Sequence, residues 1–194
     1  MRRVAVLGVA FAALLVPATG SFAKTACNLV SDKANDSGLF VPAGPVRTPA
    51  HDITSVDVAT GKKTLVVVMR LTTTALAGDP AASGGITWDV KFTIGGVGHQ
   101  FTRKIAQNGT ITDTALQNNA AIAGLVVKMD GKTVTFTVPR NNVPKLKAKN
   151  AVLTGFFAST QSGAPGASYD YAPDNARGSS ATYIDRQASC VRPA

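Results

Sequence analysis

Two short clusters of aspartates are the residues in this chain best suited to chemistry. Asp32 and Asp36 follow the first cysteine, and Asp170 and Asp174 follow the last long predicted strand. Calcium takes several oxygen ligands and is commonly held by carboxylates in flexible loops. Aspartates in such positions also cap turns without any metal. The spacing leaves two interpretations open: a calcium site formed by all four carboxylates, or two ordinary surface turns.

The chain contains two cysteines, Cys27 and Cys190, one close to each end of the domain. Neither lies in a Cys-x-x-Cys motif, so we predict one disulfide that joins the ends, with a reactive thiol pair as the alternative. Such a bond would bring the two aspartate clusters to the same end of the fold. Lys33 and Arg177 are the only bases close to them in sequence. Two bases compensate the charge of four carboxylates only in part, and the remaining negative charge favours a bound cation.

Catalytic motifs are missing from the sequence. There is no glutamate, no Gly-x-Ser-x-Gly, no phosphate-binding glycine loop and no His-Glu-x-x-His, and His51 and His99 are the only histidines. A Ser–His–Asp site can still assemble from residues far apart in sequence, because geometry defines such sites. We therefore predict a protein without catalytic activity. A secreted hydrolase built on His51 or His99 is the alternative.

Aromatic side chains on a surface would mark a ligand-binding region. Tyr169 and Tyr171 flank Asp170 in a segment rich in Gly, Ala and Pro, which we expect to be a loop. They are the candidates for stacking against a ligand, and packing over the end of the fold is the alternative. Trp88, the only tryptophan, shares one face of its predicted strand with apolar residues. We expect it in the core.

Residues 1–23 have the pattern of a cleaved secretory signal peptide. Arg2 and Arg3 precede 13 apolar residues at positions 4–16, and small residues stand before a cleavage point after Ala23. Thirteen apolar residues are too few to span a bilayer, and no other segment approaches that length. We therefore expect a secreted, extracytoplasmic protein that does not span a membrane, with one domain over residues 24–194.

The rest of the chain shows the period-two alternation of β-strands, with frequent turn signals. We predict an all-β fold, a single antiparallel β-sandwich of about eight strands. Asp130-Gly131 is a strong hairpin signal and predicts a type I′ turn. One or two helical turns over Ala115–Ala123 are the only helix we expect. The predicted strands are 52–58, 64–71, 86–94, 97–105, 125–129, 133–138, 151–159 and 181–184.

The chain is basic, with 20 Lys and Arg against 11 Asp and a net charge of +9. The densest basic segment is 140–149, where Lys145, Lys147 and Lys149 would share one face of an extended chain. No aromatic residues are interleaved with them, which argues against nucleic-acid binding. We expect a monomer that binds a cell-envelope glycan or anionic polymer. A structural envelope protein held by its positive charge is a further alternative, as is a solvated face without a partner.

Several segments resemble secreted sandwiches of the family 9 carbohydrate-binding-module-like (DOMON-like) group. The similar segments are the acidic run from Cys27 to Asp36, the strand opened by Asp52 within 51–57, and the apolar strand entered through Gly61-Lys-Lys in 61–71. The segment 170–174 is similar in place to the late acidic loop of that group. The resemblance implies a non-catalytic ligand-binding or accessory module that calcium stabilises in some members.

Overall fold

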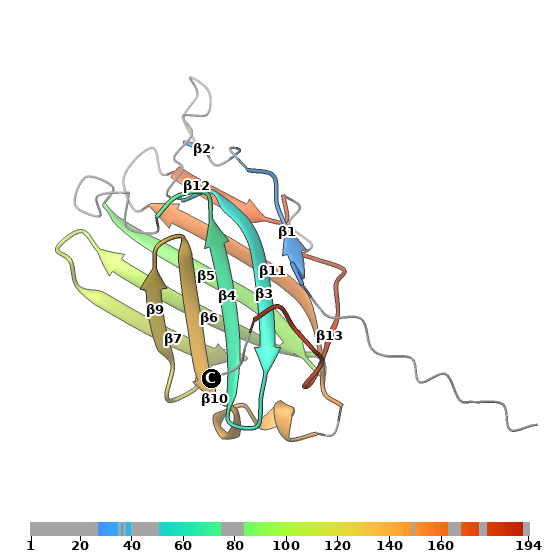
Figure 1. The fold of residues 1–194 in the computed structure, drawn as a ribbon. Coiled ribbons are helices and arrows are strands. Elements are labelled where there is room, and N and C mark those ends of the chain that lie inside the picture. Colours follow the sequence, from blue (N-terminus) through green and yellow to red (C-terminus); the bar gives the residue numbers. More distant parts are fainter. Residues whose placement is uncertain are drawn as a thin grey trace, which may run out of the picture.

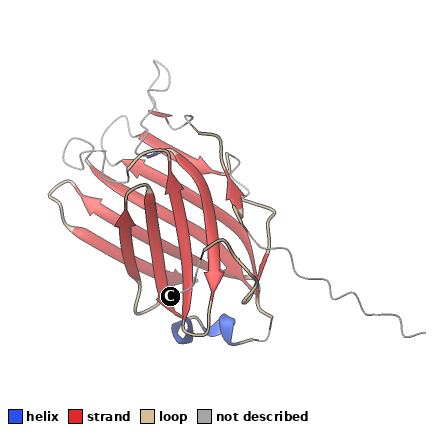
Figure 2. Ribbon diagram, viewed as in Figure 1, coloured by secondary structure: helices blue, strands red, loops and turns tan. Residues whose placement is uncertain are grey.

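Two antiparallel β-sheets face each other in the computed structural model (Figures 1 and 2). The structure describes residues 27–34, 36, 38–39, 51–74, 84–148, 150–162, 168–174 and 178–191, and the predicted signal peptide lies outside them. Within these ranges, no helix has the length and apolar character needed to cross a membrane. The all-β sandwich predicted from the sequence is confirmed.

The small sheet has five strands and the large sheet eight. The small sheet has the order β1 (Val30–Ser31), β3 (Ile53–Thr60), β4 (Thr64–Leu71), β10 (Thr133–Pro139) and β9 (Val126–Asp130). The large sheet has the order β2 (Gly38–Leu39), β12 (Ser168–Ala172), β11 (Val152–Ser162), β5 (Gly85–Ile94), β6 (Val97–Ala106), β7 (Ile111–Gln117) and β8 (Ala120–Ala121), and β13 (Tyr183–Ile184) pairs with β11. Two short 3₁₀ helices, η2 (Arg140–Asn142) and η3 (Pro144–Lys147), follow β10.

The core lies between the sheets and follows the alternation of the sequence. On β5, Ile86, Trp88, Val90, Phe92 and Ile94 are buried, and Trp88 is 0% exposed, as predicted. Phe92 packs edge-on against Phe101 of the neighbouring strand β6. Burial of this many apolar side chains is the main force that holds the two sheets together. The opposite face of β5 points outward.

Three two-residue turns set the register of the hairpins. Gly95-Gly96 and Asn118-Asn119 join β5 to β6 and β7 to β8, and all four residues have positive φ, as a type I′ turn requires. The prediction of a type I′ turn at Asp130-Gly131 is wrong in detail. Asp130 pairs with Thr133, so the turn residues are Gly131 and Lys132, and of these only Gly131 has positive φ. This is the type II′ pattern, and the predicted hairpin itself is confirmed.

Three further expectations are corrected by the structure. Residues 115–123 are not helical, because they continue β7, turn at two asparagines and return as β8. Tyr169 and Tyr171 lie on strand β12 and not in a loop, since β12 pairs with β11 on one side and β2 on the other. Lys145 and Lys147 belong to the 3₁₀ helix η3, so they do not share one face of an extended chain. Lys149 lies outside the described residues.

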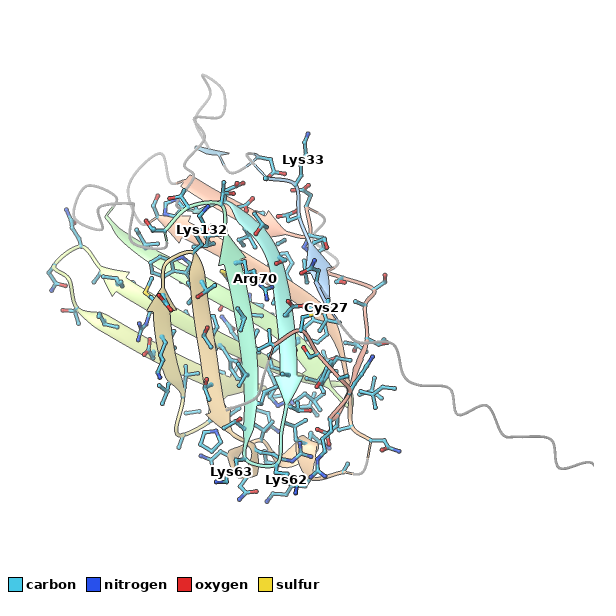
Figure 3. All side chains as sticks on the ribbon, in the orientation of Figure 1. Cys27, Lys33, Lys62, Lys63, Arg70 and Lys132 are labelled. Atoms are coloured by element: carbon cyan, nitrogen blue, oxygen red, sulfur yellow. A yellow bond between two sulfur atoms is a disulfide. The ribbon has the colours of Figure 1, made fainter. Side chains whose placement is uncertain are left out.

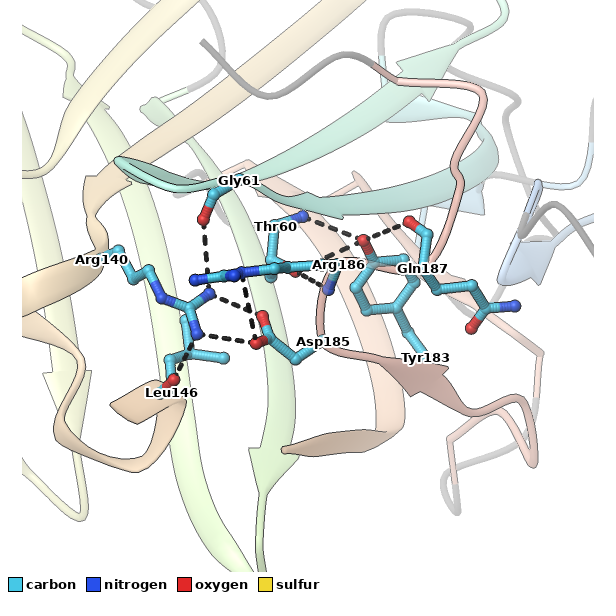
Figure 4. Close-up of polar contacts among 8 residues, drawn as sticks. All are labelled: Thr60, Gly61, Arg140, Leu146, Tyr183, Asp185, Arg186 and Gln187. Carbon is cyan, nitrogen blue, oxygen red and sulfur yellow. Dashed lines mark hydrogen bonds and ion pairs between the residues drawn. The ribbon is translucent and has the colours of Figure 1, made fainter. Parts of the chain in front are cut away.

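The two ends of the domain are joined as predicted. Cys27 and Cys190 form a disulfide with 5.3 Å between their Cα atoms. The segment around β13 is fixed further by buried polar contacts (Figure 4). Tyr183 Oη accepts a hydrogen bond from the Thr60 amide and donates one to the Gln187 carbonyl. Arg140 donates to both carboxylate oxygens of Asp185, at 2.6 and 2.7 Å.

Candidate functional site

Four carboxylates converge at one edge of the sandwich. Asp32, Asp36, Asp170 and Asp174 each place an oxygen so that all four oxygens lie within 4.8 Å of one another. Calcium binds carboxylate oxygens at about 2.4 Å, so two oxygens on one ion are at most about 4.8 Å apart. One cation could therefore touch all four. The residues that the sequence suggested as one metal site are brought together, and we call them the acidic cluster.

Strand pairing within the small sheet and one hydrogen bond between the sheets position the acidic cluster. Asp32 follows β1, which pairs with β3, and its amide donates to the Thr54 carbonyl at 3.1 Å. Asp170 lies on β12, and its Oδ2 accepts a hydrogen bond from the Ile53 amide at 2.7 Å. This contact joins the large sheet to the start of β3 in the small sheet. The convergence therefore arises where β1, β3 and β12 meet, with the disulfide as an added restraint.

A fifth carboxylate, Asp52, supports the acidic cluster from inside. It is fully buried, and its Oδ1 accepts a hydrogen bond from the Asp36 amide at 3.2 Å. Its Oδ2 accepts from the Thr72 hydroxyl. The sequence reasoning did not assign Asp52 to the site. Its position at the start of the predicted strand 52–58 did not indicate this role, which depends on the contact with the Asp36 main chain.

The electrostatics of the cluster are those of crowded, desolvated acids. Burial, with a smaller contribution from the charges of Asp32 and Asp36, raises the pKa of Asp170 to about 7 against the lowering effect of the hydrogen bond from the Ile53 amide. Burial also raises the pKa of Asp32 to about 7, with Asp174 and Asp36 adding to the rise. The pKa of Asp36 is raised by burial and by Asp174 and Asp52. Without a cation, these groups compete for ionisation.

Two oxygens of the cluster have no hydrogen-bond partner in the part of the chain that the structure describes. Asp32 Oδ2 and Asp36 Oδ1 are both buried atoms, and neither accepts a hydrogen bond from a described residue. Within the described part of the chain, no ion pair involves Asp32, Asp36, Asp170 or Asp174. Lys33 is exposed, and its side chain projects outward at the top of the molecule in Figure 3. Buried acceptors left in this state are typical of sites where an ion supplies the missing contact.

The two histidines lie inside the sandwich. His51 is 1% exposed, and its carbonyl accepts a hydrogen bond from the Thr160 hydroxyl at 2.5 Å. His99 is also buried, stacks on Phe92 with ring centroids 5.5 Å apart, and its Nδ1 lies 2.9 Å from the Val97 carbonyl. Burial lowers the pKa of both imidazoles, so both favour the neutral form.

The tyrosines predicted to bind a ligand lie on one strand, β12. Tyr171 is exposed and packs against Phe157 of β11, with ring centroids 5.6 Å apart. Tyr169 pairs with Gln161 and with Gly38 through its main chain, and its side chain lies outside what the structure describes. Tyr171 therefore has the surface exposure that stacking against a ligand requires.

Positive charge gathers at the end opposite the acidic cluster. Lys62 and Lys63 lie in the turn between β3 and β4 (Figure 3), and both are exposed. The helix η2 contacts this turn, because the Arg140 amide donates to the Lys63 carbonyl at 2.8 Å, and η3 follows η2 in the chain. Lys145 and Lys147 of η3 are exposed as well. Among the described residues, these four lysines form the basic end, and no aromatic residue lies between them in the segments 62–63 and 145–147.

Comparison of the chain with known protein families, curated proteins and solved structures finds no match.

Proposed function

We propose that this protein is a secreted, non-catalytic binding or accessory module whose β-sandwich is stabilised by calcium. The observation that carries the proposal is the acidic cluster, in which four carboxylate oxygens lie within 4.8 Å of one another. They come from segments more than a hundred residues apart in sequence. An ion held there would connect the start of the small sheet to β12 of the large sheet.

Three properties of the site support a hard cation. The ligands are all oxygens, which calcium prefers. Two carboxylate oxygens of the cluster, Asp32 Oδ2 and Asp36 Oδ1, are buried and accept no hydrogen bond from the described residues. The raised pKa values of Asp32 and Asp170 show that burial opposes their negative charges, and a divalent cation would offset that cost. The disulfide is in keeping with an oxidising, extracytoplasmic compartment.

Thermal melts with calcium and without it test this proposal. Trp88 is the only tryptophan and is fully buried, so its fluorescence reports unfolding. Calcium at a hundredfold excess over its Kd should stabilise the protein by about 2.7 kcal/mol, which raises the Tm by roughly 5–10 °C.

Asp36→Asn should remove this difference in Tm between the two conditions. Asp130→Asn is the matched control, because Asp130 is exposed at the end of β9 and should leave the calcium effect unchanged. Superimposed melts of the wild type would contradict the proposal.

The hydrolase alternative has less support from the geometry. A general base must reach a substrate, and both histidines are buried with lowered pKa values. The resemblance to the family 9 carbohydrate-binding-module-like group agrees with a binding role, and membership in that group is part of the proposal.

A charge-held envelope protein is a second candidate, because four exposed lysines gather at the basic end. Retention on immobilised polygalacturonate, with elution by moderate salt, would support it. The variant Lys62→Glu/Lys63→Glu should then lose retention. The matched pair Lys128→Glu/Lys132→Glu changes the charge equally on the β9–β10 hairpin. If both pairs act alike, net charge alone explains retention and the basic end has no special role.

A further inference from the structure

The outer face of the large sheet carries a hollow that the sequence did not suggest. It has a volume of about 530 Å³ and opens on four consecutive strands, β11, β5, β6 and β7. That volume is within the usual range for small-molecule sites. Its lining includes Lys91, Thr93, Gly98, Gln100, Leu116 and Asn118. We call it the outer hollow.

Two glycines explain why the sheet is hollow at this place. Thr93 pairs with Thr154 of β11 on one side and with Gly98 of β6 on the other. Gly98 has no side chain, and Gly155 also lines the hollow. The register of β11 shifts between Thr154 and Phe157, and Gly155 takes a φ of +64° within this bulge. A bulge of this kind bends the strand and interrupts the row of side chains.

The polar groups of the outer hollow include fixed donors and a fixed acceptor. The Gln100 amide nitrogen donates to Asp89 at 2.7 Å, which leaves the Gln100 carbonyl oxygen as an acceptor. Asn118 Oδ1 accepts from the Gly98 amide at 3.1 Å, which leaves the Asn118 NH₂ group as a donor. The ammonium group of Lys91 lies 3.7 Å from Asp89 and is half exposed. Since Asp89 offsets the charge of Lys91, the hollow is polar but nearly neutral.

An aromatic pair borders the outer hollow. Phe157 is the cross-strand partner of Lys91, and its ring packs against Tyr171, which is 46% exposed. The two rings therefore form an apolar surface next to the hydrogen-bonding groups. Leu116 adds a second apolar contact at the far side.

We propose that the outer hollow and the Phe157–Tyr171 pair bind a neutral oligosaccharide. A sugar ring presents hydroxyl groups that both donate and accept, and it also has apolar C–H faces that pack on aromatic rings. The hollow supplies donors and an acceptor with little net charge, and the neighbouring Phe157–Tyr171 pair supplies an aromatic surface. An anionic ligand would find one lysine that is already paired with Asp89. This inference rests on the proposed binding function and names the ligand class.

Titration with cellohexaose, chitohexaose, maltohexaose and an oligogalacturonate of equal length tests the proposal, with binding followed by NMR. One neutral hexasaccharide should bind.

Gly98→Val should abolish this binding, because the new side chain fills the hollow. The position tolerates a side chain, since φ is not positive there and an added Cβ meets only Asn118 Oδ1, at 3.5 Å. Tyr171→Ala should weaken binding about tenfold, as loss of a central aromatic contact does. The control Val126→Ala removes an exposed apolar side chain of β9 and should leave affinity unchanged.

Each other result overturns the assignment. Failure of all three neutral sugars to bind at millimolar concentration excludes it. Binding of the oligogalacturonate alone, with loss in salt, would make the surface an anion site. Binding unaffected by Gly98→Val would place the sugar elsewhere. Titrations in calcium and in chelator separate this inference from the acidic cluster: a calcium-dependent melt without sugar binding contradicts only the sugar site, and the reverse result contradicts only the calcium site.

Discussion

The side chains of Asp170 and Tyr171 leave β12 on opposite faces of the large sheet. Asp170 is 4% exposed and reaches across to the Ile53 amide of β3. Tyr171 is on the outer face, against Phe157. Adjacent residues on one short strand therefore belong to the acidic cluster and to the aromatic pair. An ion that orders β12 from inside would also fix the position of the tyrosine outside.

Calcium should protect the amides of β12 from hydrogen exchange. β12 is five residues long and ends next to Asp174, so its opening is coupled to the acidic cluster. Exchange measured by mass spectrometry with calcium and with chelator should differ in peptides that cover 168–174. The β9–β10 hairpin at the other edge of the sandwich is the internal reference. Equal protection of β12 in both conditions would show that no ion acts on this strand.

The stabilisation by calcium should grow with pH. Burial, together with the charges of neighbouring carboxylates, raises the pKa of both Asp32 and Asp170 to about 7, against 3.8 for an ordinary aspartate. Between these values the folded protein holds protons that the unfolded chain has released. In the absence of calcium, the free energy of unfolding should therefore fall as the pH rises from about 4 to about 7. Calcium requires the deprotonated carboxylates, so its effect increases over the same range.

Melts of calcium-bound and calcium-free protein near pH 5 and near pH 8 measure this dependence. The difference in Tm between the two forms should be larger near pH 8. Protonation of His51 and His99, which burial opposes, destabilises both forms equally and cancels in the difference. A difference that shrinks as the pH rises would contradict the assignment of these carboxylates as ligands.

Asp170→Asn should stabilise the calcium-free protein and make it insensitive to calcium. Asparagine keeps an oxygen that can accept from the Ile53 amide, but it removes one negative charge from the crowded cluster. The control Asp113→Asn removes a charge from the more exposed pair with Arg103, where the change should be within about 1 kcal/mol. Chemical unfolding followed by Trp88 fluorescence gives both values. A calcium-free variant much less stable than the wild type would contradict the view that the negative charge of Asp170 destabilises the calcium-free protein.

The disulfide should be present in the secreted product and should contribute strongly to stability. Mass spectrometry without reduction should find Cys27 joined to Cys190, and a mature chain that begins at Lys24. Cys27→Ser should reduce the free energy of unfolding by about 2–5 kcal/mol, because the bond closes a loop with a sequence separation of 163 residues. Two free thiols in the folded protein would contradict both statements.

Removal of Arg140 should destabilise the fold more than removal of Arg103. Arg140 and Asp185 are both nearly buried, and Arg140 also donates to the Leu146 carbonyl. Arg140→Met leaves a buried carboxylate without its partner and should cost about 3 kcal/mol. Arg103→Met breaks a more accessible pair and should cost about 1 kcal/mol or less. The double variant Arg140→Met/Asp185→Leu should recover much of the loss, and no recovery would mean that other contacts of Arg140 dominate.

The core strands could be predicted from the sequence. Burial of one face of a strand makes apolar and polar residues alternate along it, and this alternation is visible in the sequence. Trp88 is the clearest example, since its neighbours two residues away are all apolar. Strand β7 was missed because its first residues are exposed, so no alternation marks it. Strand β12 was missed because it is short and flanked by Gly, Ala and Pro, which are typical of loops.

The two sites differ in how far sequence could predict them. The four carboxylates of the acidic cluster were predicted to lie together from residue type and from the expected disulfide, which would bring their two segments to one end of the fold. Asp52 was not included, because its role depends on the main chain of Asp36. The outer hollow could not be predicted, since it depends on the register of four strands and on the bulge at Gly155. Two glycines on different strands give no local signal that they will be neighbours.

The disulfide between Cys27 and Cys190 also has a mechanical consequence. A load applied to the chain before Cys27 and after Cys190 passes directly through the sulfur–sulfur bond, because the two cysteines lie at the two ends of the domain. The strands between them then bear none of that tension. In the reduced protein the same load would act on the two-residue strand β1 and its pairing with β3, so the acidic cluster would be the first region pulled apart.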